Sequence, residues 1–403
     1  MRRLTWALLV AFAFCVPWAY SLDIGEPYGN IARILGLMVV AAAVPAILVS
    51  GRVRTPGALQ WLVLALFFWF CCTSLWSIDE HATLARLRAY LQVMMPVWLV
   101  WEFAEGEPDL RDLLRALVAG SWVLAALTIV SFVSADSALQ IRFAAEGHDP
   151  NDAARFLDVG FPLSALLADR EQEWPWRVLA IGFFPMGIGG VLLTASRSGF
   201  LAAVVALMGC AILLLRRQAW TVIAGAASLP AAAAALWFLV PHGTILRIAT
   251  IPEQLQHGDL NQRLNIWSAG WQAFIRAPFF GSGAGAFVSA ARLAPVDTAH
   301  NSALTFAVEG GVVALILASA IVAVCLRLVL VTRGSLRIAF ATAFLVWFVA
   351  SLTATVEGNR TTWLLVGMLS LAGRLAAREP EVTDAWPAGR APERSQALAG
   401  EIP

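Results

Sequence analysis

The sequence contains no lysine, and all 28 of its basic residues are arginine. A phosphate-binding loop of the G-x-x-x-x-G-K-[ST] type is therefore absent, and no lysine Schiff base can form. Charge of either sign is scarce, at 14% of residues, and the net charge of +1 gives no indication of a nucleic-acid partner. If the chain binds a phosphate through permanent positive charge, that charge comes from arginine. A guanidinium group can donate two hydrogen bonds to two phosphate oxygens at once.

Cysteine and histidine are also few, with five residues of each. The cysteines all fall inside apolar runs and none is paired by spacing in a loop, so we expect neither a disulfide nor a cysteine metal site. No two histidines have zinc-ligand spacing and no H-E-x-x-H motif occurs, so we expect no metal and no other cofactor.

Apolar residues make up 59% of the chain, with a mean hydropathy of +0.73. A soluble domain is closer to half apolar and a quarter charged. The sequence therefore predicts an all-α polytopic membrane protein with about twelve transmembrane helices. The predicted runs are 4–22, 31–50, 59–78, 84–104, 110–134, 156–169, 177–196, 199–215, 220–240, 302–327, 336–355 and 361–377. The run 156–169 is short enough to be a half-helix.

Arginines concentrate in the short loops on the side of the N-terminus, which predicts that both termini are cytoplasmic. We expect a transmembrane domain over residues 1–378, with a large, partly helical periplasmic loop inserted at 241–300. Residues 379–403 are rich in proline and charge and have no apolar periodicity, so they are predicted to form a disordered cytoplasmic tail.

Within the large loop, the stretch RLNIWSAGWQAFIRAPFFGSGAGAF (263–287) is predicted to form a helix followed by a glycine-containing turn. Such a helix would lie on the membrane surface or over the helical bundle. Arg263 begins it, at a helix N-terminus where a phosphate is also favoured. One apolar stripe is expected along it, from Ile266, Trp267, Gly270, Trp271 and Phe274.

Two further segments on the predicted outer side carry candidate anion ligands. Arg197 lies in the tight hairpin TASRSGF (194–200), where it either binds an anion at headgroup depth or marks the interface as a snorkelling side chain. The loop QIRFAAEGHDPNDAARF (140–156) contributes Arg142, His148 and Asn151, each of which is compatible with ordinary loop polarity.

The stretch TAHNSALTFAVEGGVVALILAS (298–319) begins with His300 and Asn301 and then enters an apolar helix that contains Glu309. If the helix starts at His300, Glu309 lies ~13 Å further along its axis. An intramembrane carboxylate marks either a tie to a neighbouring helix or support for a functional site. A stripe of small residues predicts close helix packing, and it consists of Gly310, Ala314 and Ala318.

Three of these motifs together resemble the bacterial O-antigen ligase family. Residues 299–314 are similar to its H-N-x-x-L-x-x-x-x-E-x-G-x-x-G signature, except that Ala314 stands where the family usually has the second glycine. Residues 263–287 resemble its Arg-x-x-x-Trp segment followed by Pro-x-x-Gly-x-Gly, and residues 194–199 resemble its Ser-Arg hairpin. The resemblance covers about residues 140 to 314.

This resemblance implies a metal-independent glycosyltransferase in the bacterial inner membrane, with its active site at the periplasmic face. The donor would be an O-antigen polysaccharide on undecaprenyl diphosphate, and the acceptor a sugar hydroxyl of lipid A-core in lipopolysaccharide biosynthesis. We expect His300 to be the general base and Arg197, Arg263 and Arg142 to bind the diphosphate. Asn301 would support His300 or the substrate, and a single displacement would invert the anomeric configuration.

Other functions stay open at this stage. An O-antigen polymerase or a protein O-oligosaccharyltransferase would use the same donor chemistry, although the latter usually carries more periplasmic sequence at its C-terminus. A transporter of the lipid-linked glycan is a different class, and the absence of an internal repeat disfavours it.

Overall fold

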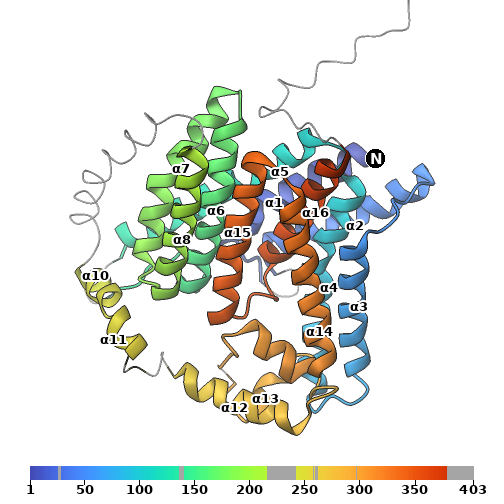
Figure 1. Ribbon diagram of the computed structural model, residues 1–403, viewed down its shortest axis with the longest axis vertical. Coiled ribbons are helices and arrows are strands. Elements are labelled where there is room, and N and C mark those ends of the chain that lie inside the picture. Colours follow the sequence, from blue (N-terminus) through green and yellow to red (C-terminus); the bar gives the residue numbers. More distant parts are fainter. Residues whose placement is uncertain are drawn as a thin grey trace, which may run out of the picture.

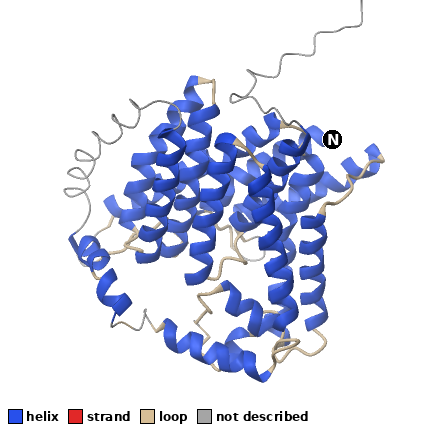
Figure 2. Cartoon of the chain, viewed as in Figure 1, coloured by secondary structure: helices blue, strands red, loops and turns tan. Residues whose placement is uncertain are grey.

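The computed structural model describes residues 1–25, 29–135, 140–215, 242–256, 258, 262–295 and 297–378. Its regular elements are helices, as Figure 2 shows. The first eight helical elements are α1 (Arg2–Cys15), the 3-10 helix η1 (Val16–Ser21), α2 (Ile31–Ser50), α3 (Ala58–Thr73), α4 (Glu80–Phe103), α5 (Glu107–Val133), α6 (Pro150–Arg170) and α7 (Trp174–Leu193). The others are α8 (Arg197–Leu215), α10 (His242–Ala249), α11 (Ile251–Gln256), α12 (Arg263–Arg276), α13 (Phe287–Ala291), α14 (Ser302–Val331), α15 (Gly334–Thr353) and α16 (Arg360–Arg378).

Seven helical segments of the described chain are long and apolar enough to cross a membrane, which establishes a polytopic membrane protein. They are α1 with η1, α2, α5, α7, α8, α14 and α15. Helices α3, α4, α6 and α16 coincide with four more predicted runs, but they are shorter or less apolar, so the count of twelve is not confirmed. The predicted run 220–240 and the predicted tail 379–403 lie outside the described residues.

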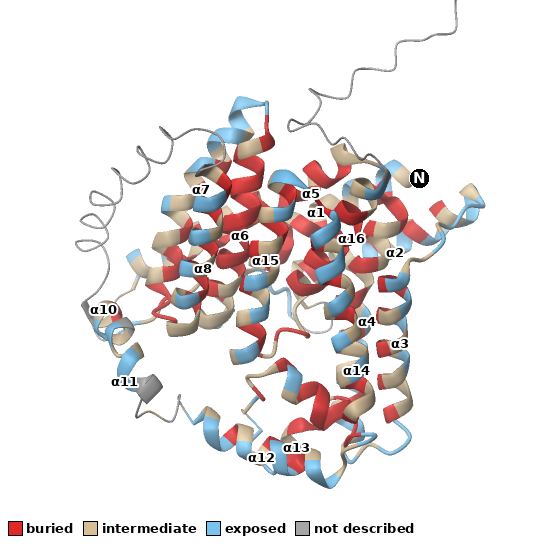
Figure 3. Cartoon of the chain, in the orientation of Figure 1, coloured by how far each residue is buried: buried red, intermediate tan, exposed pale blue. Residues whose placement is uncertain are grey.

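The short predicted run 156–169 lies within a longer helix and is not a half-helix, because α6 has 21 residues. Its first two turns are polar and escape a search for apolar runs, but Asp149 caps them by accepting a hydrogen bond from the Asn151 N–H. Pro150 then occupies the first helical position, where its missing N–H does no harm. Helix α6 packs against α5, α7, α8 and α15 and is buried along most of its length (Figure 3).

Ion pairs and hydrogen bonds tie one end of the bundle together. Arg2 pairs with Glu102 at 2.9 Å, and the Arg54 N–H donates to the other oxygen of the same carboxylate at 2.7 Å. Arg374, near the end of α16, donates to the Ala104 carbonyl at 2.7 Å. The start of α1 and the ends of α4 and α16 therefore share this end.

The opposite end of the bundle carries His300 and is called the His300 end below. Helices α10 to α13 lie at this end, and Figure 1 shows α10 and α11 beside the lower end of α8, with α12 and α13 at the bottom beneath α14. Helices α12 and α13 pack against each other and against α14. Helices α12 and α13 therefore lie over the start of α14, at the end of the bundle that carries His300.

Candidate active site

Helix α12 begins at Arg263 and ends at Arg276, within the stretch predicted for it. Its inner side buries Ile266 and Gly270 against the start of α14. A side chain at Gly270 would come within 2.9 Å of Leu304, so glycine permits the close approach. Trp271 departs from the predicted apolar stripe, since 56% of its surface is exposed. The helix therefore covers the bundle with one side and offers an aromatic side chain on the other.

His300 occupies a backbone bend that is fixed on both sides. Before it, the Trp267 indole N–H donates to the Ala299 carbonyl at 3.0 Å. After it, the Asn301 side chain accepts from the Leu304 N–H at 2.9 Å and caps α14. The φ of His300 itself is +46°, in the left-handed region that histidine enters more readily than most residues. The imidazole is thus held at the rim of the bundle.

Helix α14 begins at Ser302 rather than at His300. The Ser302 hydroxyl accepts from the Val356 N–H at 2.9 Å and lies 3.2 Å from the Ala354 carbonyl. Asn301 also donates to the Leu352 carbonyl, at 3.3 Å. Asn301 and Ser302 therefore anchor the His300 bend to the end of α15 and to the loop that leads to α16.

The environment of His300 favours its neutral form. Burial lowers the pKa of the imidazole below its usual range, and the positive charges of Arg263 and Arg155 lower it further. The carboxylates of Asp149 and Asp297 act in the opposite direction but do not reverse the shift. A neutral imidazole near pH 7 is in the state that a general base requires.

Five arginines from separate segments form one electrostatically linked group, which includes the two that act on His300, Arg263 and Arg155. They form the arginine cluster, which consists of Arg142, Arg155, Arg197, Arg247 and Arg263. Burial lowers the pKa of the Arg142 guanidinium, and the charges of Arg247, Arg197 and Arg263 lower it further, in that order. Such mutual repulsion shows an excess of positive charge that an anion would relieve.

Hydrogen bonds join the Arg197 side chain to α10 and to the residue directly after it, so the side chain is not directed along the membrane interface. Its Nε donates to the Arg247 carbonyl at 3.1 Å, and its Nη2 donates to the Thr250 hydroxyl at 2.7 Å. In return, Arg247 Nε donates to the Ala195 carbonyl at 3.2 Å. These reciprocal bonds fix the hairpin before α8 against α10, and they disfavour a simple snorkelling role for Arg197.

Arg142 is joined to the same hairpin from the other side. Its Nε donates to the Thr194 carbonyl at 3.2 Å, and its Nη2 donates to the Asn151 side-chain oxygen at 2.9 Å. That oxygen also accepts from the Ser196 hydroxyl, at 2.9 Å. Asn151 therefore connects the loop before α6 to the hairpin before α8. Arg142 and Arg197, two of the predicted arginines, are held by this hydrogen-bonded hairpin.

Sequence reasoning did not select Arg247, Arg155 or Asp149 for this site. Arg247 lies in a part of the long loop without a motif, and Arg155 immediately precedes an apolar run and forms an ion pair with Asp152. Asp149, the cap of α6, acts electrostatically on Arg142, Arg155 and Arg263 as well as on His300. The only sequence signal was the Asp-Pro helix start.

His148 does not join the arginine cluster. Its ring lies edge-on to Tyr20 and Phe156, with centroids 5.2 Å and 5.9 Å away. Burial lowers the pKa of His148 to about 4. This histidine therefore packs as a neutral ring.

Glu309 is fully buried and pairs with Arg86 of α4 at 3.4 Å. The Arg86 guanidinium also lies over the Tyr90 ring, 5.6 Å from its centroid. Of the two roles left open for Glu309, these contacts favour the tie to a neighbouring helix. The carboxylate joins α14 to α4 and does not belong to the arginine cluster.

The glycine-rich turn after α12 docks on α14 at a kink. The Gly283 N–H donates to the Glu309 carbonyl at 3.0 Å, and α14 bends at Gly311, where φ is +65°. A side chain at Gly281 would lie 2.5 Å from that same Glu309 carbonyl, and one at Gly311 would collide with the Phe279 carbonyl. These glycines therefore permit backbone contact and do not form a phosphate loop.

An apolar cavity of about 250 Å³ lies between α14, α15 and α16. Phe306, Trp347 and Phe348 contribute to its wall, while Ser302 and Glu357 line its polar part, which adjoins the His300 bend. Burial raises the pKa of the Glu357 carboxyl to about 7. The cavity combines an apolar wall with a polar end beside the candidate base.

Within the described residues, no three His, Cys, Asp or Glu side chains are grouped to hold a metal ion. Positive charge at the site comes instead from the arginine cluster.

This fold and this site define a polytopic membrane protein with a histidine and an arginine cluster at one end of its helical bundle. Residues 181–319 match the model of the O-antigen ligase family, so this chain carries an O-antigen ligase domain. The match contains Arg197, Arg263 and His300, whereas Arg142 precedes it. It confirms the family resemblance of the sequence motifs. No curated protein matches the chain.

Proposed function

We propose that the protein is an O-antigen ligase at the periplasmic face of the bacterial inner membrane. It transfers O-antigen polysaccharide from undecaprenyl diphosphate to a sugar hydroxyl of lipid A-core. The observation that carries the proposal is the neutral His300 beside Arg263 and Arg155, two members of the arginine cluster, with His300 and Arg263 inside the O-antigen ligase domain. The membrane spans and the apolar cavity beside His300 suit substrates that carry lipid chains.

In this proposal, His300 takes the proton of the acceptor hydroxyl as its oxygen attacks the anomeric carbon of the donor. The bond between that carbon and the diphosphate oxygen breaks, and the undecaprenyl diphosphate leaves with the electron pair. The proton stays on His300 until it passes to solvent or to the departing diphosphate. One displacement of this kind inverts the anomeric configuration.

The arginines stabilise the negative charge that develops on the leaving diphosphate. Arg197, Arg263 and Arg142 are proposed to bind the diphosphate, and Arg247 adds charge and holds Arg197 in place. Because guanidinium groups supply this charge without a metal ion, the proposed reaction is metal-independent. Asn301 acts through the helix cap that fixes the His300 bend.

Reconstitution tests the proposed function directly. We expect the purified protein to move glycan from undecaprenyl diphosphate to lipid A-core without ATP and in the presence of EDTA. The measurement is a mobility shift of the acceptor on a gel, together with release of undecaprenyl diphosphate.

Two other results would assign a different function. Growth of the lipid-linked polymer with an unchanged acceptor would indicate a polymerase. Movement of the intact donor between leaflets of a vesicle, without transfer, would indicate a transporter.

The pH dependence of transfer provides a second prediction. Since burial and two arginines lower the pKa of His300, the base stays deprotonated below its usual range, and activity is lost only as the pH falls through the lowered value. The acid limb of kcat/KM should therefore lie below about pH 6.5. Arg155→Gln removes a positive charge, raises the pKa of His300 and should move this limb to higher pH.

Asp297→Asn is the matched control, because Asp297 raises the pKa of the imidazole. Its removal should move the acid limb to lower pH. If both variants shift the limb in the same direction, or neither shifts it, the group that titrates is not His300.

A further inference from the structure

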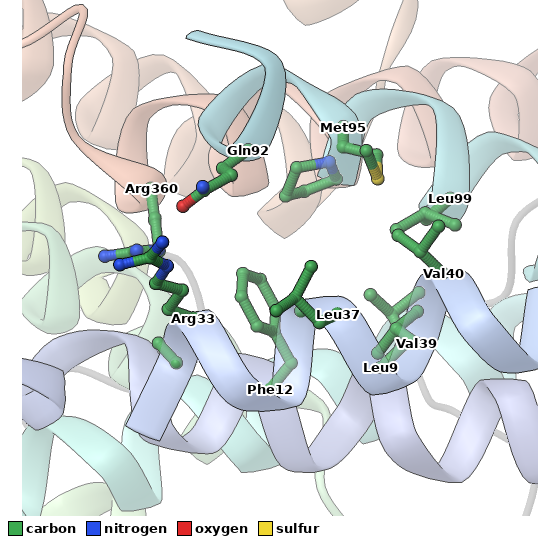
Figure 4. Close-up of a pocket in the computed structure, with 13 residues that line it drawn as sticks. Leu9, Phe12, Arg33, Leu37, Val39, Val40, Gln92, Met95, Leu99 and Arg360 are labelled. Atoms are coloured by element: carbon green, nitrogen blue, oxygen red, sulfur yellow. The ribbon is translucent and has the colours of Figure 1, made fainter. Parts of the chain in front are cut away.

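A second pair of arginines lies at the His300 end, apart from the arginine cluster. Arg33 belongs to the first turn of α2, and Arg360 begins α16. Figure 4 shows their guanidinium groups close together at one end of a pocket between α1, α2 and α4. The positive charge of Arg33 acts on Arg360, whose guanidinium also has a hydrogen bond to the Tyr20 side chain, whereas no member of the arginine cluster is among the groups that act on it. The two cationic groups are therefore electrostatically separate.

This arrangement is unfavourable as it stands. Two like charges lie together in half-buried positions, and each is in the first turn of a helix, whose dipole also disfavours a cation. Among the residues that the structure describes, neither guanidinium forms an ion pair with a carboxylate. A bound dianion would relieve the repulsion between the arginines and would also match the two helix N-termini.

The rest of the pocket suits a hydrocarbon chain. Beyond the two arginines and Gln92, its wall is apolar and includes Phe12, Met95 and Leu99 (Figure 4). The cavity measures about 40 Å³, which accommodates part of one acyl chain rather than a whole lipid. Leu37 lines the pocket and is 58% exposed on the outer surface of α2, so a lipid can enter from the side.

We propose that Arg33 and Arg360 bind a phosphate monoester of the acylated acceptor, with a short stretch of one acyl chain in the apolar pocket; this inference rests on the proposed function. Charge favours this occupant over an ordinary phospholipid. A phosphate monoester carries close to two negative charges at pH 7, whereas the diester of a phospholipid carries one. Two guanidinium groups match the monoester in charge and can both bind it in a bidentate manner.

The position also fits an acceptor. Arg360 follows the loop whose Val356 N–H is bonded to Ser302, and Ser302 follows His300 by two residues. The covalent path and this bond place Arg360 within about 25 Å of His300. A glycolipid phosphate held there leaves room for the several sugars of a core oligosaccharide to reach the base. The donor diphosphate would bind separately, at the arginine cluster.

Kinetics with two acceptors tests this inference. For the double variant Arg33→Gln/Arg360→Gln, we expect the KM for lipid A-core to rise about tenfold, while the donor KM and kcat stay unchanged. Acceptor from which the lipid A phosphates have been removed should show the same rise with the wild-type protein. It should show no further rise with the double variant, because the lost contact is the same one. Arg292→Gln, which removes an exposed arginine from the same end of the bundle, should leave all three constants unchanged.

Binding of fluorescent lipid A-core to the purified protein separates this inference from the proposed function. Phosphate-dependent binding that the double variant loses, without any transfer, would contradict the ligase assignment and keep the phosphate site. If transfer occurs but the acceptor KM depends neither on the lipid A phosphates nor on Arg33 and Arg360, the proposed phosphate site is wrong. A KM effect that appears only in vesicles of phosphatidylglycerol would also overturn the site, since the pair would then hold a membrane phospholipid. The variant Arg33→Lys/Arg360→Lys retains the charge and checks folding, and it should recover part of the affinity, because lysine keeps the charge but not the bidentate geometry.

Discussion

Replacing His300 with alanine is expected to abolish glycan transfer while the protein remains folded in the membrane. Without a base, the acceptor hydroxyl must attack with its proton in place, and the loss of a general base lowers kcat by about 10² to 10⁴. The defect should appear in kcat, because the arginines that bind the donor are unchanged. Initial rates with saturating donor and acceptor measure it directly.

Alanine also changes the backbone at this position, so a second variant is needed. The φ of His300 is +46°, and alanine adopts the left-handed region less readily than histidine or asparagine does. His300→Asn tolerates this backbone and cannot accept a proton at neutral pH. Activity in His300→Asn would remove the base assignment and leave a conformational role for the residue. His81, an exposed histidine at the start of α4, provides the control, since His81→Ala should be fully active.

The local features of the site could be predicted from the sequence. Helix α12 was predicted because apolar residues recur at helical spacing between Arg263 and Pro278. His300 was recognisable as a polar residue at the start of an apolar run. Both signals are carried by residues near one another in the chain, and local spacing is what sequence periodicity reports.

The features that depend on distant residues were not predictable. Glu309 and its partner Arg86 are 223 positions apart, and nothing in either segment identifies the other. The sequence indicated only a glycine-containing turn around Gly281 and Gly283, whereas the fold brings this turn into backbone contact with the kinked helix α14. Arg33 and Arg360 were likewise ordinary arginines at two predicted helix starts.

The length of α6 shows how the search for apolar runs fails. A helix that lies inside the bundle can begin with charged residues when other parts of the protein satisfy them. Here Asp149 caps α6 and acts electrostatically on Arg155, and Asp152 forms an ion pair with this arginine, which belongs to the arginine cluster. The polar turns that made the helix look short are therefore the part that contributes to the site.

Arg197→Lys is expected to reduce transfer by about 10² although the positive charge is kept. Lysine presents one ammonium group at the end of a flexible chain, whereas the planar guanidinium binds two partners in fixed directions. Arg197 uses Nε for the Arg247 carbonyl and Nη2 for the Thr250 hydroxyl. The substitution should therefore loosen α10 against the hairpin and also weaken bidentate contact with the diphosphate. Arg276→Lys is the matched control, because Arg276 also donates to a backbone carbonyl, that of Ala290, but lies outside the cluster.

Thr250→Val separates the two contributions of Arg197. It removes the hydroxyl that orients the guanidinium and leaves the charge and the bidentate group intact. If Arg197 acts mainly by holding α10, Thr250→Val and Arg197→Lys should reduce the rate to a similar degree. If Arg197 binds the leaving diphosphate, the lysine variant should lose far more in kcat than the valine variant, since the charge on the diphosphate is greatest in the transition state. Full activity of Arg197→Lys would contradict both roles and return Arg197 to an interfacial anchor.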